Sequence, residues 1–168
     1  IAINSAIERV TFADYSVIGD TTAANKLADL CNTLFTTGKS NNLPKHYLVS
    51  LLDLGIWKNK QVGVYGFSED ITTGVYCGNT SAYIALQVAC YMGFKEIYFV
   101  AVDLDDYCGN THFDGTYNES GDRQLWFKEC NKAFASCVDK LKELGVQVFD
   151  CSPLRGITAF PKYELYKI

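Results

Sequence analysis

Asp103, Asp105 and His112 are the residues of this chain whose types and spacing could do chemistry. They lie in the polar stretch VDLDDYCGNTHFDGTY, residues 102–117, which overlaps the end of an apolar run. Carboxylates two residues apart can hold a divalent cation, which prefers oxygen ligands, against a nucleotide diphosphate. His112 is a candidate general base, because imidazole titrates near neutral pH and aspartates stand close in sequence to orient it. Both patterns also occur in ordinary solvated turns, so neither one alone defines a site.

A second candidate site is the segment GNTS, residues 78–81, which leads into a predicted helix. Gly78 permits a close backbone approach, and the first N–H groups of the helix could bind a phosphate together with the Thr80 and Ser81 hydroxyls. The same residues fit plain helix capping equally well. The sequence contains neither the Walker motif nor the G-x-G-x-x-G motif, which excludes the standard sites for nucleoside triphosphates and dinucleotides.

The elements that must position these residues follow from hydrophobic periodicity and turn signals. Strands are predicted at 1–4, 15–20, 46–52, 95–103 and 146–152, and helices at 21–37, 80–93 and 122–145. This alternation predicts a doubly wound, mainly parallel α/β sheet with helices on both faces, formed by residues 1–168 as a single domain. The near-continuous apolar run 95–103 predicts a strand covered on both faces. Ligands of such sheets bind beyond the carboxyl ends of the strands, where Asn4, Asp20 and Asp103 stand.

Charge and composition limit the kinds of partner and the compartment expected for this chain. The net charge is −4 and no run of Lys or Arg exceeds two residues, which argues against a nucleic-acid groove. No apolar run reaches the length of a membrane span. The seven cysteines are odd in number and form no C-x-x-C pair, which favours a reducing cytoplasm over a disulfide framework or a zinc site.

The block SAYIALQVACYMGFKEIYFVAVD at 81–103, with HF at 112–113 and AFPKYEL at 159–165, resembles the DUF115 Rossmann-like family, also described as 6-hydroxymethylpterin diphosphokinase MptE-like. The opening segments IAIN and YSVIGD fit the same pattern, so the resemblance spans essentially the whole chain. The block is also similar to the bacterial sialyltransferases of glycosyltransferase family 42. Both families begin with a glycine-containing nucleotide loop on a strand before the segment that matches IAIN. The resemblance therefore implies a Rossmann-like sheet that here lacks its first strand.

The resemblance to the sialyltransferases also implies roles for individual residues. It places Asn79, Thr80 and Ser81 on the segment that contacts the CMP-sugar, and Asp103 on that family's aspartate. Thr111 falls near a phosphate-contacting tyrosine, and His112 is a substitute candidate for a catalytic histidine that comes later in the family. Two further positions, Asn4 and Asp20, lie where the family places groups around the nucleotide and sugar. Asp105 replaces a tyrosine of the family, so the metal hypothesis depends on the D-x-D pattern alone.

Three functions remain open. The first is a glycosyltransferase of bacterial surface-glycan synthesis that moves a sugar from a CMP-sugar type of donor to a glycan hydroxyl and requires no metal or other cofactor. The second is a Mg²⁺-dependent ATP:6-hydroxymethylpterin pyrophosphokinase, with Asp103 and Asp105 as ligands. The third is a non-catalytic module that binds a nucleotide or a glycan. The expected partners are a nucleotide-activated sugar and a glycan acceptor, and a homo-oligomer is compatible with all three functions.

Overall fold

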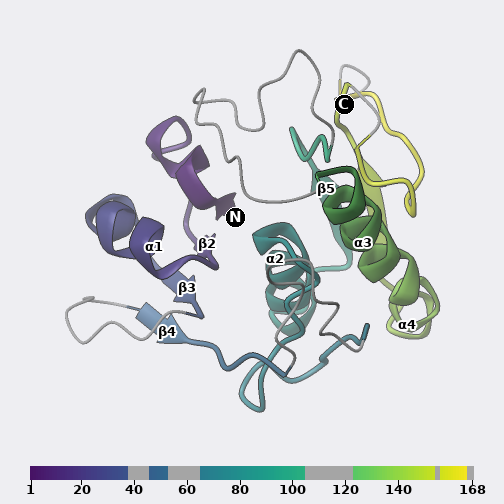
Figure 1. The fold of residues 1–168 in the computed structure, drawn as a ribbon, viewed down its shortest axis with the longest axis horizontal. Coiled ribbons are helices and arrows are strands. Elements are labelled where there is room, and N and C mark those ends of the chain that lie inside the picture. Colours follow the sequence, from purple (N-terminus) through teal and green to yellow (C-terminus); the bar gives the residue numbers. More distant parts are fainter. Residues whose placement is uncertain (38–45, 53–64, 105–122, 154–155, 166–168) are drawn as a thin grey trace.

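The computed structural model describes residues 1–37, 46–52, 65–104, 123–153 and 156–165, and shows a mixed α/β arrangement with two small parallel sheets (Figure 1). The first sheet contains β1 (Ala2–Ile3), β2 (Ser16–Ile18), β3 (Leu34–Thr36) and β4 (His46–Leu48) in that order, and the second contains β5 (Glu96–Phe99) and β6 (Gln147–Asp150). The helices are η1 (Asn4–Glu8), α1 (Thr21–Leu27), η2 (Ala28–Leu30), α2 (Ser81–Tyr91), α3 (Arg123–Ser136) and α4 (Val138–Glu143).

The four-stranded sheet has both faces covered, as predicted for a parallel sheet. Every residue of β2 and β3 is buried, and Val17 pairs in register with Phe35. Ile18 packs with Ile7 of η1 and with residues of α1 on one face. Val17 packs with Ile84 and other residues of α2 on the opposite face. Coverage of both faces explains why buried residues do not alternate with exposed ones along these strands.

The two-stranded sheet is covered on one face by the described residues. Phe99 and Val148 point into a core that includes Phe134 of α3. On the other face, Tyr98 stacks on Phe149 with ring centroids 5.0 Å apart and is 36% exposed. The prediction that residues 95–103 form a strand buried on both faces is therefore wrong for the part of the chain that the structure describes.

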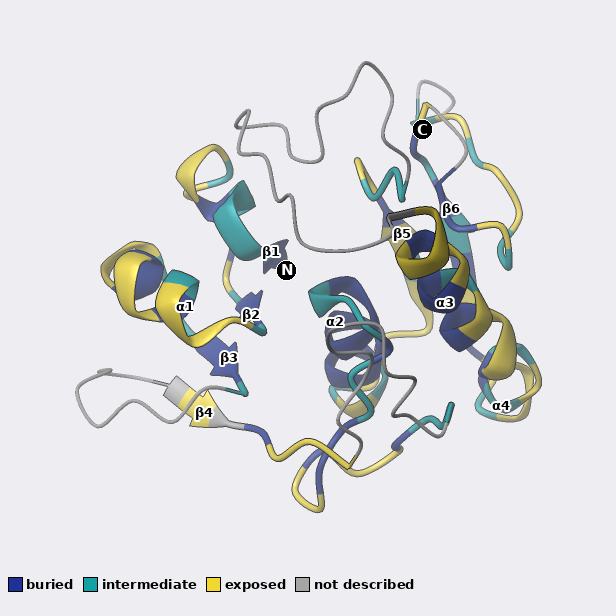
Figure 2. Cartoon of the chain, viewed as in Figure 1, coloured by how far each residue is buried: buried dark blue, intermediate teal, exposed yellow. Residues whose placement is uncertain are grey.

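Helix α2 lies between the two sheets and contributes to both cores. Its residues from Ala82 to Ala89 are all buried, as Figure 2 shows by the dark blue of this helix. Tyr83 and Leu86 pack toward β5, β6 and α3, whereas Ile84 and Val88 pack toward the four-stranded sheet. A helix that is apolar on all sides must be enclosed, and this position between two sheets encloses it.

The ends of α2 follow the sequence signals. Thr80 caps its start by accepting a hydrogen bond from the Ala82 N–H at 3.3 Å. Gly93 has a φ of +88°, and the Phe94 N–H donates to the Ala89 carbonyl at 3.2 Å, which is a Schellman ending. The prediction of a helix at 80–93 is confirmed within two residues at its end.

The predicted helix 21–37 is wrong beyond Leu27. The chain leaves the helix through the short 3-10 turn η2, Cys31 is extended, and residues 34–36 form β3. The Asn32 side-chain amide donates to the Ala13 carbonyl at 3.0 Å and anchors the turn between η2 and β3. Pairing of β3 with strands on both sides outweighs the helical spacing of its apolar residues.

Two helices, α3 and α4, occupy the region predicted as one or two helices at 122–145, and β6 confirms the strand predicted at 146–152. None of the helices in the described ranges is both long enough and apolar enough to cross a bilayer.

Candidate functional site

The candidate site lies where β1, β2 and β5 end and where α2 begins. Asn4 directly follows β1, Asp20 comes two residues after β2, and Asp103 comes four residues after β5. A hydrogen bond from the Gly19 N–H to the Ser81 hydroxyl, 3.1 Å long, joins the end of β2 to the first turn of α2. A Cβ at Gly19 would lie 2.8 Å from the Ser81 Oγ, so this close approach needs glycine.

The GNTS segment shows the geometry of helix capping. The Thr80 hydroxyl accepts from the Ala82 N–H, and the Thr80 N–H donates to the Cys77 carbonyl at 3.2 Å. Two of the N–H groups around the helix start are thus already hydrogen bonded, and the Ser81 hydroxyl accepts from Gly19. The phosphate cradle predicted here could use the Ser81 N–H and the proton of the Ser81 hydroxyl.

Gly78 is required by packing. Its φ is +54°, and a Cβ at this position would overlap the ring of Tyr83, which is fully buried. The Tyr83 hydroxyl donates to the Gly66 carbonyl at 2.7 Å, so the ring cannot easily move away. The reason predicted from sequence, close approach of the backbone to a ligand, is not needed to explain this glycine.

Asp20 acts as the N-cap of α1. Its Oδ1 accepts from the Ala23 N–H at 2.7 Å, and the residue is exposed. The neighbouring Gly19 carbonyl accepts from the Thr37 hydroxyl at 2.6 Å, which ties the end of β2 to the end of β3. The capping bond accounts for one carboxylate oxygen of Asp20, and the exposed side chain remains accessible to a ligand.

Asp103 lies in a turn with two unusual backbone conformations. Ala101 and Leu104 have φ values of +57° and +40°, a region that costs a non-glycine residue about 1–2 kcal/mol. Between them, the Val102 N–H donates to the Ser152 hydroxyl at 3.0 Å, and the Asp103 carbonyl accepts from the Gly156 N–H at 2.9 Å. Hydrogen bonds to the segment after β6, residues 151–153 and 156–165, therefore hold this turn. We call these residues the C-terminal segment.

All four non-glycine residues with positive φ in the described ranges belong to the candidate site. Asn4 has a φ of +50° and Asn79 a φ of +60°, and Ala101 and Leu104 are the other two. The Asn4 Oδ1 is buried and has no hydrogen-bond partner among the described residues. Left-handed backbone outside glycine persists where the surrounding structure enforces it, and such positions cluster at functional sites.

Sequence reasoning missed Glu129. This carboxylate of α3 is only 3% exposed, and its Oε1 pairs with Lys132 at 2.5 Å, whereas its Oε2 has no hydrogen-bond partner in the described part of the chain. The adjacent Cys130 thiol contacts the Asn79 carbonyl at 3.7 Å, which places this part of α3 beside the GNTS segment. A buried acceptor of this kind could receive a hydrogen bond from a ligand hydroxyl. Helical periodicity cannot reveal it, because the FKEC segment looks like a solvated turn of a helix.

The buried thiols of Cys130 and Cys137 and the partly buried thiol of Cys90 are structural. Burial, with a smaller contribution from the nearby Cys77, raises the pKa of Cys130 far above its usual range. Burial likewise raises the pKa of Cys137 to about 12 and that of Cys90 to about 11. A thiol is a nucleophile only as its thiolate, so these cysteines are unreactive near neutral pH.

Three predicted residues, Asp105, Thr111 and His112, lie outside the described residues. The metal hypothesis at Asp103 and Asp105 and the general-base hypothesis at His112 therefore stay predictions. Within the ranges that the structure describes, no group of three or more His, Cys, Asp or Glu residues could hold a metal ion.

No protein-family model, curated protein sequence or solved structure matches this chain significantly. The resemblances found in its sequence therefore remain predictions. The assignment of the site depends on the positions of Asn4, Asp20, Ser81 and Asp103 at the strand ends and the start of α2. An apolar pocket between α4, β6 and the C-terminal segment, lined by Leu141, Val148 and Phe160 among others, includes none of them.

Proposed function

We propose that this protein is a glycosyltransferase-like enzyme of bacterial surface-glycan synthesis that transfers a sugar from a CMP-sugar type of donor to a glycan hydroxyl. The observation that carries the proposal is the concentration of left-handed residues after β1 and β5 and before α2, at Asn4, Asn79, Ala101 and Leu104. A binding site explains why the chain maintains this strain at one edge. The resemblance to DUF115 proteins and to sialyltransferases supplies the reaction class.

The proposal also includes a more specific fold than the two separate sheets. We infer that β1 and β5 belong to one Rossmann-like sheet. Each is the edge strand of its sheet, both sheets are parallel, and α2 packs on both. Ile3 of β1 packs against the cores of both sheets.

In this proposal the start of α2 binds the nucleotide phosphate through the Ser81 N–H and hydroxyl, with support from the helix dipole. Asn4, Asp20 and Asn79 surround the nucleotide and sugar. His112 or Asp103 removes the proton of the acceptor hydroxyl, and the phosphate contacts stabilise the leaving nucleotide. No metal is required for this route, and a reducing cytoplasm suits the six cysteines in the described ranges, all of which are free thiols.

A thermal-shift panel with CMP, CDP, UDP, GDP and ATP, each with and without Mg²⁺, tests the proposal. We expect a cytidine nucleotide to raise the melting temperature without Mg²⁺, because a ligand that binds only the folded state stabilises it. A shift with ATP that requires Mg²⁺ and is lost with EDTA would instead favour pyrophosphoryl transfer. No shift with any nucleotide would contradict both enzymes and leave a glycan-binding module.

The catalytic base needs a separate test. We expect His112→Ala to abolish sugar transfer while leaving the nucleotide-induced thermal shift intact. Turnover that survives in this variant would assign the base to another residue, and Asp103→Asn is the next variant to measure.

A further inference from the structure

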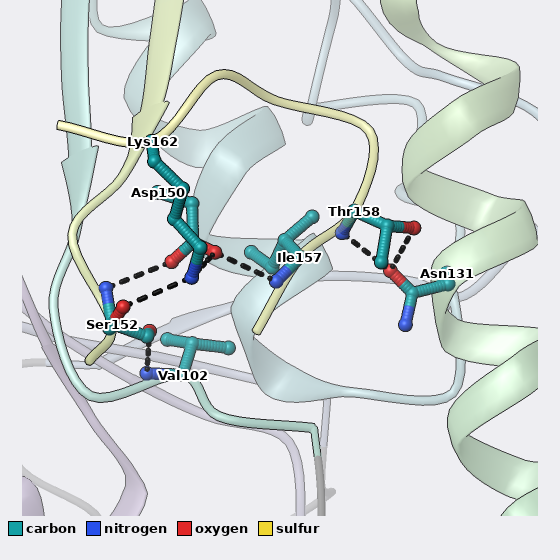
Figure 3. A network of polar contacts seen from close by, with 7 residues as sticks. All are labelled: Val102, Asn131, Asp150, Ser152, Ile157, Thr158 and Lys162. Atoms are coloured by element: carbon teal, nitrogen blue, oxygen red, sulfur yellow. Dashed lines mark hydrogen bonds and ion pairs between the residues drawn. The ribbon is translucent and has the colours of Figure 1, made fainter. Parts of the chain in front are cut away.

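The buried carboxylate of Asp150 holds the C-terminal segment at several points (Figure 3). Asp150 ends β6 and is fully buried. Its Oδ1 accepts from the Ser152 N–H at 2.9 Å, and its Oδ2 accepts from the Ile157 N–H at 3.1 Å. The Lys162 ammonium pairs with the same Oδ2 at 2.6 Å and donates to the Ser152 carbonyl at 2.9 Å. A buried carboxylate is tolerated only with such partners. The negative charge of Asp150 therefore favours the conformation of the segment that supplies them.

Two hydrogen bonds extend this network to the turn after β5. The Ser152 hydroxyl accepts from the Val102 N–H at 3.0 Å, and the Gly156 N–H donates to the Asp103 carbonyl at 2.9 Å. Gly156 has a φ of +54°, and a Cβ there would overlap the Asp150 carboxylate. Gly156 thus lies directly between the Asp103 carbonyl and the Asp150 carboxylate, and Ser152 connects Asp150 to Val102.

The two residues held in this way are those between the left-handed positions. Val102 and Asp103 are flanked by Ala101 and Leu104, whose φ values are +57° and +40°. Neither flanking residue is a glycine or asparagine, so local sequence does not favour the turn. The hydrogen bonds from the C-terminal segment therefore favour this conformation over an ordinary extended one.

We propose that Asp150 is a positioning residue for the candidate site. Its ion pair with Lys162 fixes Ser152 and Gly156, which in turn hold Val102 and Asp103 in the left-handed turn at the end of β5. The positioning itself does not depend on which ligand the site takes. Its consequence for ligand binding rests on the proposed nucleotide-sugar function.

Amide hydrogen exchange followed by NMR tests the positioning. In Lys162→Met we expect exchange at the Val102 and Gly156 amides to become about tenfold faster or more, because their hydrogen-bond partners are released. Lys162→Arg should restore most of the protection. The matched control is Lys142→Met, since Lys142 pairs at 3.1 Å with the exposed Asp139 of α4 and contacts neither amide. Unchanged exchange at Val102 and Gly156 in a folded Lys162→Met protein would overturn the proposal.

Ser152→Ala covers the case in which Lys162→Met does not fold. This variant keeps the ion pair and removes only the acceptor of the Val102 N–H. We expect faster exchange at Val102 with the Gly156 amide still protected. An equal loss of protection at both amides, or no loss at either, would contradict the proposal that Ser152 and Gly156 hold the turn through separate hydrogen bonds.

Nucleotide affinity separates this inference from the proposed function. If CMP binds the wild-type protein, we expect Lys162→Met to weaken binding by about tenfold at a temperature where the variant is fully folded, and Lys162→Arg to recover it. Unaltered affinity would show that Asp150 serves stability alone. If CMP does not bind the wild-type protein, the proposed function fails, whereas the exchange measurements still decide the positioning.

Discussion

The two parallel sheets keep their strand ends in place by different chemistry. At the four-stranded sheet the links are neutral or exposed: the Ser81 hydroxyl on Gly19, the Thr37 hydroxyl on the Gly19 carbonyl, and the exposed cap Asp20. At the two-stranded sheet the link is the buried Asp150 paired with Lys162. Separate neutral links can be lost one at a time, whereas removal of the half-exposed Lys162 leaves the buried Asp150 carboxylate without its counter-charge. The end of β5 should therefore respond to mutation more abruptly than the end of β2.

The core of the two-stranded sheet contains one aromatic side chain that contacts several elements. Phe134 of α3 is fully buried and contacts the rings of Tyr83, Phe99 and Phe160. We expect Phe134→Ala to lower the free energy of unfolding by about 3–5 kcal/mol, because it leaves a cavity where α2, α3 and β5 meet. Urea denaturation measures this, with Phe12→Ala as the control, since Phe12 is 83% exposed. A loss below about 1 kcal/mol would show that the core can collapse around the cavity.

The cap of α1 should have a smaller effect. Asp20→Ala removes the acceptor of the Ala23 N–H, and we expect a loss of about 1 kcal/mol, within a range of about 0.5–2 kcal/mol. Asp14→Ala is the matched control, because Asp14 is exposed and precedes a strand. If nucleotide affinity falls in Asp20→Ala while the stability loss stays small, the same carboxylate also contacts the ligand.

The Ser81 link tests whether neutral connections act independently. Ser81→Ala leaves the Gly19 N–H without this acceptor, and we expect a loss of about 1 kcal/mol or somewhat less, because the contact is only partly buried. Thr37→Val should cost a similar amount, and the double variant should cost more than either alone. A double variant that is no less stable than Ser81→Ala would mean that the two hydrogen bonds depend on each other, like the contacts that meet at Asp150.

The smallest effect is expected in mild alkali and concerns the core around α2 and α3. Burial raises the pKa of Cys137 from 9.0 to about 12, so the folded protein keeps this proton while the unfolded chain loses it above pH 9. Its contribution to stability is complete below pH 9 and is lost as the pH rises toward 12. At pH 9 we expect Cys137 alone to account for a loss of less than about 0.5 kcal/mol relative to neutral pH. Urea midpoints at pH 7 and pH 9 measure it, and Cys137→Ala should reduce the difference.

Local signals were sufficient for some elements of the fold. The Thr80 cap, the apolar run and Gly93 define α2, since each acts through neighbours in sequence. β3 could not be predicted in the same way, because Leu34 and Phe35 lie at helical spacing from the residues of α1 and only pairing with β2 and β4 makes them a strand.

The same limit applies to the candidate site. Asn4, Asp20 and Asp103 could be selected from the sequence, because they follow predicted strands and ligands of parallel sheets bind beyond the strand ends. The left-handed turn at Ala101 and Leu104 could not be foreseen, because glycine, the usual signal for such a turn, is absent from residues 101–104. Its cause lies about 50 residues later in the chain, in contacts of Ser152 and Gly156 that no local pattern encodes.

The position of α2 between the two sheets has a consequence for cooperativity. Neither sheet can keep its core if α2 detaches, because Tyr83 and Leu86 complete one core while Ile84 and Val88 complete the other. The two sheets should therefore unfold in one transition rather than as separate units, in the manner of small two-state proteins. In refolding, α2 can form early from local contacts, whereas β5 must find β6 about 50 residues later in the chain. We therefore expect α2 to form before the pairing of β5 with β6 is complete.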